Sequence, residues 1–200
     1  MPTTDGRDLL QDALHVSVVS ALWTLTASTA AVGIGLVGHA LALVAFGAVG
    51  VLDCAASVAL VAHFRDAQAG GTAERLERVA LHVVTLGLLT VGAATATVSV
   101  LHLIDRPATT SSTASVLLAA VSVVALSLLS LRKRHVAQRL PSHALLADSH
   151  LSAVGAVLAA VTLGGTVAAS ALGWWWADPV AALGIAVGAG GVAWTIRHEP

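Results

Sequence analysis

The sequence predicts an all-α protein that forms a six-helix transmembrane bundle. Of its 200 residues, 56% are hydrophobic and only 10% are charged, and the mean hydropathy is +0.86. Soluble domains carry about 25% charged residues, so this composition indicates a membrane protein. At about 20 residues per span, the chain has room for five or six helices and for no sizeable soluble domain. Its long apolar runs lack the alternating pattern of barrel strands.

Polar interruptions divide the apolar sequence into six expected helices. No Asp, Glu, Lys or Arg lies between Asp12 and Asp53, a stretch too long for one helix, and the GIGLVGHA segment offers a turn inside it. Polar loops are expected at FRDAQAGGTAERLER, DRPATTSST, RKRHVAQRLPSH and GWWWADP. The expected helices cover residues 15–37, 39–63, 78–104, 114–131, 144–172 and 179–196. Together they form a transmembrane domain, 15–196, between a cytoplasmic N-terminal segment, 1–14, and a cytoplasmic tail, 197–200.

The basic residues predict how this bundle lies in the cell membrane. In a six-span layout, every Lys and Arg except Arg106 falls at the end that holds both termini. Cytoplasmic ends carry the excess of basic residues, so both termini are expected in the cytoplasm. The N-terminus is polar and mildly acidic, and we expect no cleavable signal peptide. A net charge of −1 gives no indication of a nucleic-acid partner.

One carboxylate, Asp53, interrupts the apolar run AFGAVGVLDCAASVALVAHFRD. A carboxylate at the centre of a membrane helix costs at least about 2.5 kcal/mol, so we expect this group to be used, paired or neutralised. Asp148 and His150 lie near the start of the fifth expected helix. Our hypothesis is that Asp53, Asp148 and His150 converge on one cavity and bind either a metal ion or a small polar molecule. In an enzyme the same three groups would be catalytic.

The other polar and aromatic features have plainer interpretations. Cys54 is expected to pack as a small hydrophobe, and the three tryptophans at 174–176 form an interface belt. Asp178 is expected to cap the sixth helix. His82 and His102 are further candidates for the site, but His102 also lies near Asp105 and fits an interfacial pair. We interpret the RKRH run as an anchor near anionic lipid. The GGTVAAS and GIAVGAGG segments are expected to form tight contacts between helices.

Four segments resemble helices of the cation diffusion facilitator family. LALVAFGAVGVLD resembles its second helix, LERVALHVV the start of its third, RLPSHALLADSHLSAVGAVLAAVTLGG its fifth and GWWWADPVAALGIAV its sixth. The resemblance runs from about Trp23 to Arg197. It implies a six-helix membrane domain of the short bacterial type without a cytoplasmic domain. It also implies a homodimer and the exchange of a divalent metal such as zinc for protons.

The expected metal site departs from the family pattern. The family places two ligands one turn apart in helix two and two in helix five, so that four groups surround one ion. Asp53 matches the second position in helix two, but Val49 stands at the first. Counted from Asp148, the helix-five positions hold Leu151 and Gly155, which are not ligands. His150 lies one residue away, about 100° around the helix.

Three functions therefore remain open from the sequence. The first is a transporter that moves a divalent cation, or protons, across the membrane. The second is a membrane-embedded enzyme on the same scaffold, in which Asp and His groups act as general acid and base on a small polar metabolite of a biosynthetic pathway. The third is a partner or scaffold subunit without chemistry of its own.

Overall fold

The computed structural model describes the backbone of residues 4–68, 73–105, 112–139 and 143–198, and side chains mainly at 16–54, 82–105, 112–138 and 149–194. Over these residues the chain forms six α-helices and no strand. They are α1 (Thr4–Val37), α2 (Leu41–Gln68), α3 (Ala73–Asp105), α4 (Thr113–Arg139), α5 (His143–Ala171) and α6 (Ala177–His198). The all-α prediction is confirmed, and each predicted span lies almost wholly within one observed helix.

Five of the helices contain stretches long and apolar enough to cross a membrane. These stretches are Val18–Val37, Thr85–Asp105, Thr113–Val136, Ser149–Ala171 and Ala177–Trp194. In α2 the corresponding described stretch is shorter, Leu41–Cys54. The whole of α2 has 28 residues, or about 42 Å at 1.5 Å per residue. The class of multi-pass membrane protein is therefore confirmed, and the sixth span stays a prediction.

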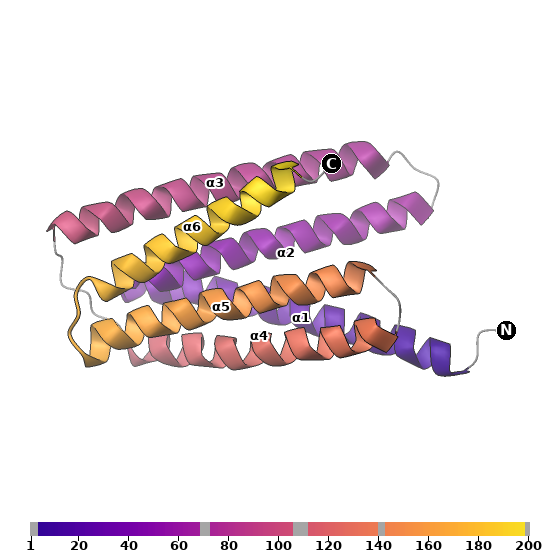
Figure 1. Cartoon of the computed structure of the whole chain (residues 1–200), viewed down its shortest axis with the longest axis horizontal. Coiled ribbons are helices and arrows are strands. Elements are labelled where there is room, and N and C mark those ends of the chain that lie inside the picture. Colours follow the sequence, from indigo (N-terminus) through magenta and orange to yellow (C-terminus); the bar gives the residue numbers. More distant parts are fainter. Residues whose placement is uncertain (1–3, 69–72, 106–111, 140–142, 199–200) are drawn as a thin grey trace.

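The helices run side by side along the long axis of the bundle, with successive helices in opposite directions (Figure 1). The most extensive contacts join α4 to α5, α1 to α2 and α3 to α6. Both termini lie at one end, which we call the terminal end. At the opposite end, which we call the far end, α1, α3 and α5 finish and α2, α4 and α6 begin. This layout places the starts of α2 and α6 at the same end of the molecule.

Two segments that we expected to be loops are largely helical. α4 continues to Arg139, so the RKRH run is part of that helix. α2 ends at Gln68 and α3 begins at Ala73, so most of FRDAQAGGTAERLER is helical as well. Arg, Lys, Gln, Glu and Ala are strong helix formers, and their charge alone does not end a helix. The turn expected in GIGLVGHA is present at its end, where His39 has a positive φ of 51°.

Small residues bring the helices together, and large apolar residues point outwards. The interior is mostly alanine, with Leu43 and Ile185 fully buried. A Cβ on Gly165 would collide with Ala181 of α6, which confirms the tight contact predicted for GGTVAAS. Leu22, Leu36 and Val187 are all at least 60% exposed. A surface of this kind suits a bilayer, in which helices associate through close packing and face lipid with apolar side chains.

Candidate functional site

Asp53 lies half-buried in α2, between two residues that contact α1 and α3. Its neighbour Cys54 directs its thiol to the carbonyl oxygen of Ala21 in α1, at 3.9 Å. On its other side Leu52 packs so closely on α3 that a Cβ on Gly87 would lie 2.7 Å from it. Asp53 is twelve residues from Leu41, or about 18 Å along the helix from the far end. The acidic residue predicted from the sequence is therefore partly buried in α2, away from the far end of the bundle.

The structure separates the surroundings of the other two predicted site residues. Asp148 belongs to the start of α5, and its side chain lies outside the described residues. His150 is exposed, whereas its neighbours Ser149 and Ser152 are buried. Among the described side chains, no three His, Cys, Asp or Glu residues lie close enough together to hold a metal ion. The convergence of Asp53, Asp148 and His150 on one site stays a prediction.

A buried lysine between α4 and α5 is a feature that the sequence analysis missed. Lys133 is only 3% exposed, and its Nζ donates a hydrogen bond of 2.9 Å to the hydroxyl of Ser152. One turn away, Ser130 donates to the carbonyl oxygen of Ser149 at 2.9 Å. Arg132 and Arg134, on either side of Lys133, are exposed. One side chain of the basic run, that of Lys133, therefore points into the bundle, on the face of α4 that also carries Leu126 and Ser130.

Replacing Lys133 with alanine should lower the free energy of unfolding by about 1–3 kcal/mol. The change removes the hydrogen bond to Ser152 and leaves a buried hydroxyl without this partner, and it also empties the space that the lysine stem fills. Arg132→Ala is the matched control, because it removes the same charge from an exposed position and should change stability by no more than about 0.5 kcal/mol. Thermal unfolding in detergent compares the two. Equal effects would show that the buried contact contributes nothing.

Asp178 ties the beginning of α6 to the beginning of α2. Its carboxylate accepts a hydrogen bond from the backbone N–H of Leu41 at 2.6 Å and another from that of Ala42 at 3.3 Å. Asp178 itself is fully buried. The sequence analysis expected this residue to cap its own helix, but its carboxylate caps α2. The reason is that both helices begin at the far end, so the side chain reaches the free amides of its neighbour.

His102 of α3 also belongs to this cluster. It interacts electrostatically with Asp178. Asp105 is exposed, and its interfacial pair with His102 stays a prediction. The Nδ1 atom of His102 and the hydroxyl of Ser99 are buried and have no hydrogen-bond partner among the described residues. The far end therefore contains a carboxylate from α6 that holds the start of α2, together with an imidazole and a hydroxyl from α3.

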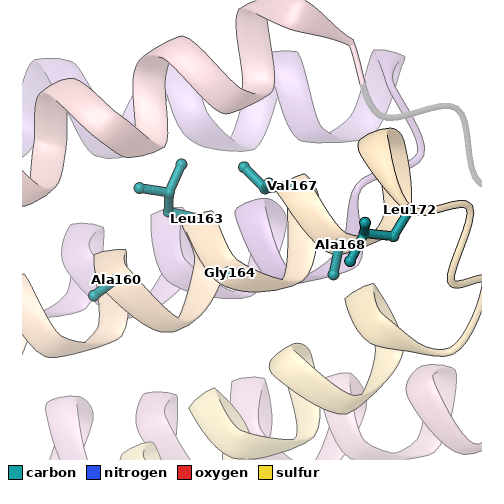
Figure 2. Close-up of a pocket in the computed structure, with 6 residues that line it drawn as sticks. All are labelled: Ala160, Leu163, Gly164, Val167, Ala168 and Leu172. Carbon is teal, nitrogen blue, oxygen red and sulfur yellow. The ribbon is translucent and has the colours of Figure 1, made fainter.

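An apolar groove runs along the outer side of α5. It is lined by Ala160, Leu163, Gly164, Val167, Ala168 and Leu172 (Figure 2). No lining side chain is polar, so the groove supplies no acid, base or ligand group. Nearby at the far end, Trp174 and Trp176 stack with ring centroids 5.2 Å apart and are both exposed. Their place suits the predicted interface belt.

These observations define the class of the protein. A bundle of long helices with five membrane-spanning stretches and apolar outer surfaces is an integral membrane protein with several spans. No protein-family model matches the chain, and no curated protein matches it either. The assignment beyond this class therefore depends on the site.

Proposed function

We propose that the protein is a transporter of the cytoplasmic membrane, similar in plan to the cation diffusion facilitators, that moves protons or a small cation. The observation that carries the proposal is Asp53, a half-buried carboxylate in the apolar part of α2, about 18 Å from the far end. Ionisable side chains inside membrane segments are costly and mark ion and proton pathways. A helical bundle gives such a group access from either end when its helices shift.

The described residues favour a proton or a loosely held cation over tightly bound zinc as cargo. Zinc sites take three or four protein ligands, and no such group is present among the described side chains. A single carboxylate is enough to carry a proton. A divalent ion such as zinc would need Asp148 or further groups beside Asp53, and His150 is turned outwards.

The arrangement of charge supports an orientation with both termini in the cytoplasm. α1 starts and α6 ends at the terminal end (Figure 1). The exposed Arg132 and Arg134 of α4 lie near the same end. Basic residues at one end of a bundle mark its cytoplasmic side. We infer a multi-pass protein with Asp53 within the bilayer and Asp178 on the outer side.

Flux through the purified protein in liposomes tests this function. Asp53→Asn keeps the size and polarity of the side chain but removes its charge, so proton or metal uptake should fall to the level of empty liposomes. Asp105→Asn changes an exposed carboxylate at the far end and should leave uptake unchanged. A pH-sensitive dye and a zinc-sensitive dye inside the vesicles distinguish the two cargoes.

If wild-type liposomes take up neither protons nor divalent metals, or if Asp53→Asn transports as fast as wild type, Asp53 is not an ion-binding group of a transporter. The enzyme alternative would then have to be tested by product formation in membranes. The apolar groove on α5 gives that alternative no acid–base group.

A further inference from the structure

The cluster around Asp178 joins the starts of two helices, a feature that ion transport at Asp53 does not require. One buried carboxylate holds the first two amides of α2 and belongs to the first turn of α6. The first turn of α6 also packs against α5, because a Cβ on Gly165 of α5 would be in van der Waals contact with the Cα of Asp178, at 3.6 Å. A single ionisable side chain therefore fastens α2 to α6 at the far end.

α3 offers this carboxyl group a second set of partners. Gly92 marks the α3 face that meets α6, since a Cβ there would lie 3.3 Å from the carbonyl oxygen of Ala186. Ser99 is two turns further along the same face, and the antiparallel direction of α6 places its first turns opposite. Ser99 is fully buried, and its hydroxyl lacks a partner among the described residues. Nδ1 of His102 is also buried and also lacks a hydrogen-bond partner among the described residues. His102 interacts electrostatically with Asp178.

The charge of the carboxyl group decides which set of partners it prefers. An ionised carboxylate suits the start of α2, because it accepts two N–H groups and faces the positive end of the helix dipole. A protonated carboxyl group loses most of this advantage and gains an O–H donor. That O–H would donate to Nδ1 of His102, and the carbonyl oxygen of the same group would accept from the hydroxyl of Ser99. Both buried atoms otherwise lack a partner among the described residues, a costly condition in a protein interior.

We propose that Asp178 is a proton-operated latch at the far end of the bundle. In its ionised form it fastens the start of α2 to α6. When it takes up a proton from the outer side, it releases the α2 amides and hydrogen-bonds to Ser99 and His102 on α3. The latch works whatever the cargo of Asp53, because it lies at the other end of the described part of α2.

The surroundings leave few other groups to account for a response to acid at this point. His39, in the turn before α2, and Asp105, at the end of α3, are exposed. Apart from His102, which belongs to the latch itself, the remaining described titratable side chains on the helices that pack against α6 are Asp53, Cys54, His82 and His150. Each of these four lies at least about three turns from the far end. The α5 residue against Asp178 is Gly165, which does not titrate.

Hydrogen–deuterium exchange of the detergent-solubilised chain tests the latch without any gradient or cargo. The readout is the protection of the Leu41 and Ala42 amides, corrected at each pH for the intrinsic exchange rate. Acidification of the wild type should reduce this protection by roughly fivefold to tenfold, the size of an N-cap contribution. α4 provides an internal control at the same end, because Ser112, whose hydroxyl does not titrate, caps the amide of Ser115 at 3.2 Å.

Two variants separate the latch from general loosening. Asp178→Asn cannot ionise, so its Leu41 and Ala42 amides should show no dependence on acid. Ser99→Ala removes one partner of the released carboxyl group, so acid should cause a smaller loss of protection than in the wild type. The latch is wrong if Asp178→Asn still responds to acid, if Ser99→Ala responds as fully as the wild type, or if the Ser115 amide loses protection in parallel. None of these results bears on ion flux through Asp53.

Discussion

Replacing Asp178 with alanine should lower the free energy of unfolding by about 2–4 kcal/mol. The change removes the acceptor of the Ala42 amide, which is buried, and of the Leu41 amide, which is partly buried. Each unsatisfied buried donor costs about 1–3 kcal/mol. It also removes the negative charge that the start of α2 favours and opens a space beside Pro179, which is fully buried. For a chain of this length, the melting temperature in detergent should fall by roughly 5–15 °C.

Two comparison variants show whether the loss of stability comes from the cap that Asp178 provides for α2. Asp105→Ala removes a carboxylate from the same end of the bundle, but from an exposed position, and should change the melting temperature by about 2 °C or less. Asp178→Asn keeps one acceptor oxygen for Leu41 and should lose less stability than Asp178→Ala. If Asp178→Ala melts within the error of Asp105→Ala, the carboxylate does not hold α2 and α6 together.

The sequence predicts the fold well because the signal comes from long uniform runs. Six apolar segments separated by polar ones allow few arrangements, and the six observed helices contain the predicted spans almost completely. The errors lie at the terminal end, where helices continue through charged residues such as the RKRH run. Polarity marks where a helix leaves the membrane, and this point precedes the end of the helix by a turn or more.

The site is harder to predict because its contacts join residues far apart in the chain. Asp53 could be identified from its cost in an apolar segment alone. Asp178 looked like the cap of the helix that it begins, and nothing near it in the sequence indicates that it reaches Leu41, 137 residues away. His102 lies three residues from Asp105 but interacts with Asp178. Local spacing suggests partners on the same helix, and the packing of α3 against α6 adds a partner that local spacing cannot reveal.

The burial of Lys133 has a signal in the sequence, but this signal is weak. It stands in a run of basic residues, which suggests a solvated face. Its spacing from Leu126 and Ser130, seven and three residues, places it instead on the inner face of α4. This periodicity becomes informative only once α4 is known to continue past Leu131 as a helix.

Gly47→Leu should be the most damaging exchange of a single apolar position in the bundle. A Cβ at residue 47 would lie 2.6 Å from the carbonyl oxygen of Ser28 and 2.8 Å from the backbone nitrogen of Val32. Both atoms belong to the α1 backbone, which cannot turn aside as a flexible side chain can. The helices must separate, and the loss of their packing should cost about 3 kcal/mol or more.

Gly33→Leu provides the control, because a Cβ at that position of α1 meets no other atom within 4 Å. Gly33 is exposed, and leucine is the better helix former by about 0.5–1 kcal/mol, so this variant should be as stable as the wild type or slightly more stable. Thermal unfolding in detergent should therefore give shifts of opposite sign for the same substitution. Equal losses of stability would mean that leucine is tolerated equally badly at both positions. The close approach of α1 and α2 at Gly47 would then not be what distinguishes the two positions.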